Sequence, residues 1–501
     1  MPGVRTLRCV CGPARRFSSS RRRCAKETAS KHVLRDYNIT TTFRYSLLHD
    51  LPPQVQAYPW ATPTSLRRVR TPPRRVKMIA REYRLPASCS SSIDTSSFVY
   101  DSLYNPNYGY FSKQARIFSP SEPFEFPKIK NSLAYDRLVA DAINKFEDSL
   151  GPERDASTSR QVFHTPSELF KPYYGEALAR HLVHQYRLHY YPHANLCIYE
   201  IGGGNGTLML NILDYIREND PQVYNSMEYR TIEISPQLAK QQRQTIEKSK
   251  FGRDHSQHVE TVQMDVLTWN VPVRHPCYVL AMEVIDNLPH DVIRYDPTTG
   301  RPLQGVVLID EQGEFEEAYT ASMDELPQKY LSLREKLGYK HLPLSHPQRT
   351  PAILRRAFHS LPYTGKLSSK EFIPTTLLQL LDVLNEYFPH HHLLLSDFDS
   401  LPNAIPGYMS PVVQTRYQRS MVPCTTYLVQ QGYFDIFFPT DFEELQGLYG
   451  MLCPSYFGTR RTQIVTHKEF LEKWGDLKAT TTRSGENPMT DYYKNVRMLI
   501  S

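Results

Sequence analysis

The sequence of 501 residues contains no run of 18 or more apolar residues, so it predicts no transmembrane helix. It has no Cys-x-x-Cys pair; four of its eight cysteines lie in the first 90 residues, and the other four are far apart. This pattern favours reduced thiols and speaks against a disulfide framework or a zinc site. The chain also lacks an internal repeat, a Gly-x-Ser-x-Gly elbow and a phosphate-binding lysine loop, so nothing supports a serine hydrolase or a P-loop enzyme.

Acidic residues are scarce in the first 90 residues, which contain 19 lysines and arginines but only 4 acids. The rest of the chain has 40 basic and 48 acidic residues, so its net charge is negative. A nucleic-acid-binding surface needs lysine and arginine clustered on the folded part of a protein. The distribution of charge therefore argues against a nucleic-acid partner.

Residues 1–35 have ten lysines and arginines and a single acid, Glu27. An arginine-rich, serine-containing and acid-poor segment is typical of a mitochondrial transit peptide, and we expect mitochondrial import. A disordered basic tail, or a nuclear signal at Arg21–Arg23, would have a similar composition. Residues 36–92 contain several helix-breaking prolines and a second basic run, so they are expected to form a disordered linker.

Residues 93–501 are predicted to form one α/β domain. Short apolar runs alternate with helical patterns, which is typical of a parallel sheet with right-handed crossovers. The runs are Leu196–Ile201, Thr231–Ile234, Val259–Val262, Tyr278–Met282 and, after a long interruption, Leu393–Asp397. We expect an N-terminal helical part (93–190), a ligand-binding core (191–289), an inserted lobe (290–375) and a C-terminal part of the sheet (376–501).

Other elements follow from the same patterns. Helices are expected at 132–150 and from Thr165, as N-cap, to about Tyr190. In the lobe we expect a hairpin of Asp291–Tyr295 with Gly305–Asp310, and helices at Glu325–Lys336 and Ala352–His359. Tyr427–Gln430 and Asp435–Phe438 are further strand candidates.

Gly202, Gly204 and Gly206 directly follow the first predicted strand, and Thr207 begins a helix. Glycines at such a junction allow a tight turn and a close approach of a ligand to the helix N-terminus. Dinucleotide dehydrogenases usually place the third glycine one residue later. The shorter spacing favours S-adenosyl-L-methionine, whose methionine end has no pyrophosphate; a plain tight turn is the alternative.

Three acids follow the next three predicted strands. An acid at Glu233 can accept hydrogen bonds from ribose hydroxyls, and Asp265 can face an adenine amino group. Glu283 follows the fourth strand, where a methyl acceptor would lie. Ligands of open parallel sheets bind at the carboxyl ends of the strands, so together these residues predict a Rossmann-like class I methyltransferase; a doubly wound binding domain of another kind is the alternative. Taken singly, each acid is also compatible with a solvated strand end or a helix cap.

These residues and their neighbours resemble the MidA family, mitochondrial methyltransferases that serve as assembly factors for respiratory complex I. The resemblance runs from about Phe98 to the C-terminus. The matching motifs are Tyr104–Phe111, Thr165–Glu168, Tyr174–Glu176, Glu200–Leu208, Glu283–Pro289, Ser396–Phe398, Asp435–Phe442 and Val465–Leu471. The chain departs from the family pattern at Gly203, Met282 and Asn287, of which the last two adjoin the expected acceptor site.

The resemblance implies type II arginine methylation, the symmetric dimethylation of an arginine in a complex I core subunit in the mitochondrial matrix. The cofactor would be S-adenosyl-L-methionine, bound by Glu200, Gly202, Gly204, Gly206, Glu233 and Asp265. A guanidinium is protonated at neutral pH, so carboxylates are needed to orient it and to take its proton. We expect Glu283 and Asp286 to be catalytic, with Glu168 as a further candidate.

Two other functions stay open from the sequence. The altered residues near Glu283 are compatible with a non-catalytic complex I assembly chaperone on a methyltransferase fold. A nicotinamide oxidoreductase is disfavoured by the glycine spacing. His390–His392 could be taken for a metal site, but adjacent side chains of a strand alternate, and we expect a solvated loop instead. The sequence does not fix the oligomeric state, and a homodimer is one of the options.

Overall fold

The computed structural model describes residues 91–501 apart from 152–160, 298, 310–314, 339, 341, 344–345, 360–366, 403, 405–406, 418–419 and 455–460. The expected transit peptide and almost all of the expected linker lie outside the described residues. Their assignment, and the domain boundaries given above, therefore stay predictions.

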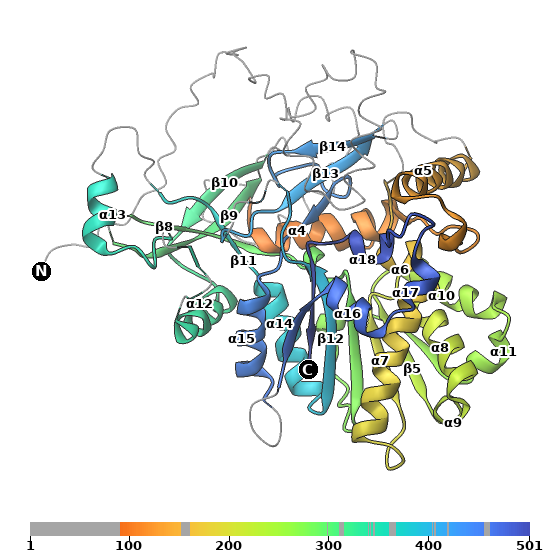
Figure 1. Cartoon of the computed structure of the whole chain (residues 1–501). Helices are drawn as coiled ribbons and strands as arrows, with labels where there is room; N and C mark the ends of the chain where they lie inside the picture. The colour runs from red at the N-terminus through yellow and green to blue at the C-terminus, as the bar shows by residue number, and fades with distance from the viewer. Residues whose placement is uncertain are drawn as a thin grey trace, which may run out of the picture.

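A seven-stranded sheet forms the centre of the molecule (Figure 1), and its strand order is β16-β17-β12-β7-β4-β5-β6. The strands are β4 (Cys197–Ile201), β5 (Glu228–Glu233), β6 (Val259–Gln263), β7 (Cys277–Met282), β12 (His391–Phe398), β16 (Gln463–Thr466) and β17 (Val496–Ile500). Strands β4, β5, β6, β7 and β12 are parallel, whereas β17 runs antiparallel to β12 and β16. The predicted mostly parallel sheet, with its five core strands, is confirmed.

Helices cover both faces of this sheet, because successive strand residues point to opposite sides. Ile198 and Leu280 belong to the core under α7 and α8, whereas Tyr199 and Val279 belong to the core under α14 and α15. The helices around the sheet are α5 (Ser132–Ser149), α7 (Tyr173–His189), α8 (Thr207–Asn219), α9 (Pro221–Tyr224), α10 (Pro236–Lys248), α11 (Gly252–His255), α14 (Thr375–Tyr387), α15 (Phe442–Leu452), α16 (His467–Trp474), α17 (Leu477–Thr480) and α18 (Pro488–Asp491). The sheet is therefore doubly wound, as predicted.

A second, antiparallel sheet is built mainly from residues 290–375. Its strands are β1 (Ser91–Asp94), β8 (Asp291–Tyr295), β9 (Pro302–Ile309), β10 (Phe315–Thr320) and β11 (Glu371–Ile373). The expected hairpin is the β8–β9 pair, and the two expected helices are α12 (Glu325–Leu337) and α13 (Ala352–His359).

Helix α4 (Thr95–Tyr104) links this second sheet to the carboxyl end of the main sheet (Figure 1). Its first residue, Thr95, donates a hydrogen bond from its hydroxyl to the carbonyl of Gly305 in β9, over 3.2 Å. Farther along α4, the hydroxyl of Tyr100 donates to Asp265, which follows β6. A two-stranded parallel pair, β2 (Ala115–Ile117) and β3 (Gln161–Phe163), lies between α4 and α6 in the chain.

Three expectations about local structure are wrong. The helix after Thr165 is broken into α6 (Pro166–Leu169) and α7, because Pro172 has no N–H to continue the first helix. Tyr427–Gln430 is irregular, and the neighbouring sheet consists of β13 (Val412–Tyr417), β14 (Ser420–Cys424) and β15 (Asp435–Phe437). His391 is not in a solvated loop but buried in β12, where its ring contacts the carbonyl of Phe388 and the hydroxyl of Tyr449.

Over the described ranges, no helix is both long and apolar enough to span a membrane.

Candidate active site

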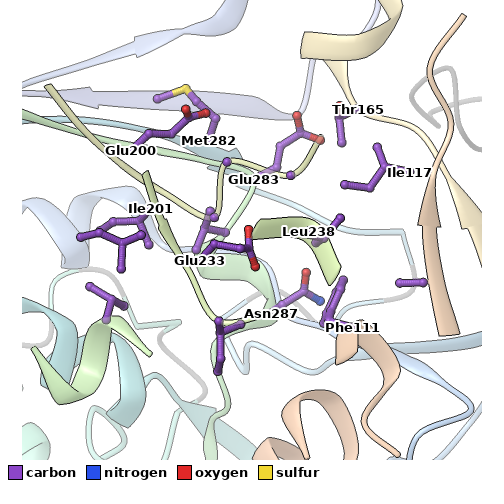
Figure 2. Close-up of a pocket in the computed structure, with 18 of the residues that line it drawn as sticks. Phe111, Ile117, Thr165, Glu200, Ile201, Glu233, Leu238, Met282, Glu283 and Asn287 are labelled. Atoms are coloured by element: carbon purple, nitrogen blue, oxygen red, sulfur yellow. The ribbon is translucent and has the colours of Figure 1, made fainter. Parts of the chain in front are cut away.

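The strand order of the main sheet reverses between β4 and β7, and a pocket opens beside this point. The chain passes from β4 outward to β5 and β6, and then returns to β7 on the other side of β4. Figure 2 shows residues from these strand ends, including Glu200, Glu233 and Glu283, around one space. The structure therefore brings the candidate residues of four separate strands together.

Gly202, Gly203 and Gly204 of the glycine loop line this pocket, whereas Gly206, also expected to bind the cofactor, is not among the lining residues. Gly202, Gly204 and Gly206 all have positive φ angles, of 68°, 53° and 80°. Gly206 directly precedes α8, and its N–H donates to the carbonyl of Gly203 over 2.8 Å, which closes a tight turn. The positive φ of Gly204 favours glycine there, and a Cβ atom would also lie 3.0 Å from the end of the Ile117 side chain in β2, which would have to shift slightly.

Glu233, at the end of β5, is buried and held from two sides. Its carboxylate accepts hydrogen bonds from the backbone N–H of Ser235, over 2.9 Å, and from the amide of Gln242, over 3.1 Å. The same amide donates to the carbonyl of Gly204, so Gln242 joins the acid to the glycine loop. Burial raises the pKa of Glu233 to about 7.

Asp265 follows β6 and is half-buried in the pocket wall. One carboxylate oxygen accepts the N–H of Leu267 over 2.9 Å, and the other accepts the hydroxyl of Tyr100. Tyr100 was not among the residues expected in the site. It reaches the pocket from α4, more than 160 positions before Asp265, and only the tertiary structure brings the two together.

Glu200 lies beneath the glycine loop. One of its oxygens accepts the hydroxyl of Tyr229 over 2.9 Å, and a Cβ atom on Gly203 would lie 3.3 Å from that same oxygen. Burial raises the pKa of Glu200 to about 7. The Glu200 side chain lines the pocket. Because it is fixed by Tyr229 and lies against Gly203, it also supports the glycine loop.

Glu283 follows β7 and lines the pocket in a strained conformation. Its φ angle is +55°, which is uncommon for a residue with a side chain. Its backbone N–H donates to the carbonyl of Ser396 in β12 over 2.8 Å. Its carboxylate forms no hydrogen bond or ion pair within the part of the chain that the structure describes. Burial, and then the nearby charge of Asp397, raise the pKa of this carboxyl well above its usual range.

Asp286, the second expected catalytic residue, lies outside the pocket lining and is buried. Its backbone N–H donates to the carboxylate of Asp397 over 3.1 Å, and one of its own carboxylate oxygens has no partner among the described residues. Burial and the charge of Asp397 raise the pKa of Asp286 well above its usual range. Of the two expected catalytic acids, Glu283 therefore lines the pocket and Asp286 does not.

Aromatic side chains that were not among the residues expected in the site also line the pocket. They come from α4, from the segment after it and from β3, and they are Tyr100, Tyr104, Phe111 and Phe163. The rings of Tyr104 and Phe111 stack with centroids 5.7 Å apart, and the Tyr104 hydroxyl donates to the carbonyl of Asn287. The sequence alone does not distinguish aromatic residues that pack in a core from aromatic residues that line a pocket.

The charge of the pocket fits a cationic cofactor. Five carboxylates line it, from Glu168, Glu200, Glu233, Asp265 and Glu283, and no lysine, arginine or histidine is among its described lining residues. S-adenosyl-L-methionine carries a sulfonium and an ammonium group, which five acids would favour. A dinucleotide carries a pyrophosphate, whose charge the same acids would repel, so the oxidoreductase alternative loses support.

Residues 177–454, more than half of the chain, match the model of a family of S-adenosyl-L-methionine-dependent methyltransferases. The chain belongs to this family, and S-adenosyl-L-methionine is its cofactor. The family membership and the cofactor expected from the sequence are therefore confirmed.

Two known proteins illustrate the similarity. The mitochondrial protein arginine methyltransferase NDUFAF7 homologue of Schizosaccharomyces pombe is 26% identical over 332 residues, which are 64% of this chain and 67% of the relative. A Burkholderia thailandensis protein solved with S-adenosyl-homocysteine bound has a TM-score of 0.52 at 14% identity, over 89% of this chain and 95% of that one. The native crystal structure of a Burkholderia thailandensis protein of the same superfamily has a TM-score of 0.51 at 14% identity, over the same shares of the two chains. At this identity, the likeness shows a common fold.

Proposed function

We propose that the protein is an S-adenosyl-L-methionine-dependent arginine N-methyltransferase that forms symmetric dimethylarginine in a core subunit of mitochondrial complex I. The observation that carries the proposal is the carboxylate of Glu283, which lines the pocket without a hydrogen-bond or ion-pair partner among the described residues. A half-buried acid of this kind is suited to a cationic side chain that arrives from outside.

A guanidinium matches this end of the pocket in both shape and charge. The pocket lining offers both features that a guanidinium uses, namely aromatic rings at Tyr104 and Phe111 on which a planar cation can stack, and a carboxylate at Glu283 that can accept its N–H groups. Arginine is the side chain that combines a flat face with a forked set of donors. A lysine could pair with the same carboxylate, but its ammonium group has no planar face that could stack on the aromatic rings.

When bound, the cofactor supplies an electrophilic methyl group on its sulfonium. Glu283 orients the acceptor nitrogen, and it takes the proton that this nitrogen loses as the new bond forms. The raised pKa of Glu283 strengthens its affinity for that proton. Asp286 does not touch the pocket, and we assign it to the support of the loop that carries Glu283.

The substrate and the compartment are supported by the relative and by the sequence. The Schizosaccharomyces pombe relative is a mitochondrial protein arginine methyltransferase, and the first 35 residues of this chain have the composition of a transit peptide. We therefore place the protein in the mitochondrial matrix, with a complex I subunit as its protein substrate. Symmetric dimethylation and the complex I target follow from the family resemblance.

The first test is methyl transfer to complex I. Purified full-length protein is incubated with methyl-labelled S-adenosyl-L-methionine and with complex I isolated from cells that lack this protein. Mass spectrometry then identifies the labelled residue. Label on an arginine that carries one methyl group on each terminal nitrogen supports the proposal; label on lysine, or none at all, contradicts it. Cofactor binding without transfer to any subunit would favour the non-catalytic assembly chaperone.

A further inference from the structure

We propose that Glu168 binds the α-ammonium group at the amino-acid end of the cofactor. The inference rests on the assignment of this pocket to S-adenosyl-L-methionine. It gives Glu168 a role in binding the cofactor, in place of the catalytic role that the sequence suggested.

Only one of the two carboxylate oxygens of Glu168 has hydrogen-bond partners among the described residues. Glu168 lies on the short helix α6, 2% exposed, and lines the pocket beside the glycine loop. Its Oε1 atom accepts hydrogen bonds from the side chains of Asn205, over 2.8 Å, and Thr207, over 3.0 Å. Its Oε2 atom is buried without a hydrogen-bond partner among the described residues.

A buried carboxylate with one free oxygen is costly, because its lost contacts with water are not replaced. Lys171 is close enough for its charge to interact with that of Glu168, but it does not supply the missing hydrogen bond. Lys171 directs its ammonium group to the hydroxyl of Ser119, over 2.7 Å, and to the carbonyl of Pro120, over 2.5 Å. The pocket itself has no described basic lining residue, so the missing donor is expected to come from the ligand.

The order of the acids around the pocket identifies that donor. Asp265 follows β6, where adenine is expected, and Glu233 ends β5, where ribose is expected; Glu283 follows β7, where the sulfonium must meet the acceptor. Glu168 lies on the remaining side, in hydrogen-bond contact with the loop and with the first residue of α8. The part of the cofactor still to be placed is its amino-acid end, which carries one ammonium and one carboxylate group.

Glu200 is the other acid near this end, and its surroundings make it the weaker candidate. It lies under the backbone of Gly203 and already accepts the hydroxyl of Tyr229. None of its oxygens is left buried without a partner, in contrast to Oε2 of Glu168.

The test compares two ligands of the full-length protein by calorimetry. S-adenosyl-homocysteine carries the ammonium group, whereas 5′-methylthioadenosine shares the adenine, the ribose and the sulfur but lacks the amino-acid end. The variant is Glu168→Gln, which keeps an oxygen for Asn205 and Thr207 and removes the charge. We expect its affinity for S-adenosyl-homocysteine to fall about 10- to 100-fold, and its affinity for 5′-methylthioadenosine to change less than about threefold.

The outcomes separate this inference from the cofactor assignment. Equal losses for both ligands would mean that Glu168 acts through the shape of the loop, and no loss for either would mean that it does not contact the ligand; both overturn the inference. Wild-type protein that binds neither ligand would overturn the cofactor assignment as well. If Glu168→Gln does not fold, Glu168→Asp, which shortens the reach of the carboxylate, is expected to show the same selective loss.

Glu176→Gln is the matched control. Glu176 lies on α7, pairs with Arg180 over 2.9 Å and does not line the pocket. Its substitution removes the same charge from a nearby helix, and we expect unchanged affinity for both ligands.

Discussion

The carboxylate of Asp397 accepts a hydrogen bond from the backbone N–H of Ile285, over 2.9 Å. Asp397 lies in β12 and Ile285 in the loop after β7, and the two strands are parallel neighbours. Two residues before Ile285, Glu283 adopts its left-handed φ of +55°. Left-handed backbone is strained for a residue with a side chain, so it persists only where the surroundings hold it. The hydrogen bond from Ile285 to Asp397 helps to hold Glu283 in this conformation, at the end of the pocket where the methyl acceptor is expected.

Replacing Asp397 is therefore expected to destabilise the protein. In Asp397→Ala, the N–H groups of Ile285 and Asp286 lose their acceptor in a buried place, which predicts a free energy of unfolding lower by about 2–4 kcal/mol. Asp397→Asn keeps one oxygen and should lose less than about half of that amount. Urea unfolding followed by circular dichroism measures both. Equal losses in the two variants would show that the charge of Asp397, and not its role as an acceptor, matters.

Gly204→Ala should weaken cofactor binding without unfolding the protein. The added Cβ would strain a backbone with a φ of +53° and would press against Ile117, so the loop must move. We expect the affinity for S-adenosyl-homocysteine, measured by calorimetry, to fall more than about 10-fold. The matched control is Gly450→Ala in α15, where a Cβ would meet nothing within 4 Å. Wild-type affinity in Gly204→Ala would contradict the role assigned to the loop.

Cofactor affinity should rise with pH through neutrality. Glu233, with a pKa raised to about 7 by burial, can accept two ribose hydroxyls only in its carboxylate form. Below pH 7 the proton must be released before binding, which weakens affinity; above pH 7 that cost disappears. A single group with this pKa predicts about tenfold tighter binding of S-adenosyl-homocysteine at pH 8 than at pH 6.

Two variants separate Glu233 from other buried acids in this prediction. Glu233→Gln should bind weakly and with a smaller dependence on pH across this range, and any dependence that is left is assigned to Glu200, whose pKa burial also raises to about 7. Asp291 also has a pKa raised to about 7 by burial, but it bonds to Thr375 outside the pocket lining, so Asp291→Asn should keep the wild-type dependence. Loss of the dependence in Asp291→Asn instead would assign it to a general change in the fold.

Much of the fold could be predicted because its signals are local. Each apolar run covers only a few consecutive residues, and the glycines at 202, 204 and 206 directly follow the first run, so strand, turn and helix can be predicted from short stretches of sequence. The break before α7 was missed because a proline at position 172 was outweighed by the apolar periodicity around it. His391 was misplaced because polarity alone does not reveal a partner such as Tyr449, which lies 58 residues further along the chain.

The candidate site likewise contains residues that could be predicted from the sequence and residues that could not. Glu233, Asp265 and Glu283 could be found because the ends of parallel strands meet at one edge, so position in the strand is sufficient. Tyr100, Gln242 and Asp397 could not, because each reaches the site from another element through a contact that no spacing encodes. The unpaired Oε2 atom of Glu168 could not be predicted either, because the packing of the folded molecule decides which oxygen finds a hydrogen-bond partner.

Glu283→Gln tests the proposed chemistry most directly. The amide can still accept a hydrogen bond from an acceptor arginine, but it can neither pair with its charge nor take its proton. We expect the rate of methyl transfer to a complex I subunit to fall about 10²- to 10⁴-fold. The affinity for S-adenosyl-homocysteine should stay within about twofold of wild type, because the cofactor is held by other residues. Glu472→Gln, a change in a half-exposed acid of α16, is the control for both measurements. A Glu283→Gln variant with wild-type transfer would remove Glu283 from the reaction, whereas loss of cofactor affinity would place it among the cofactor-binding residues.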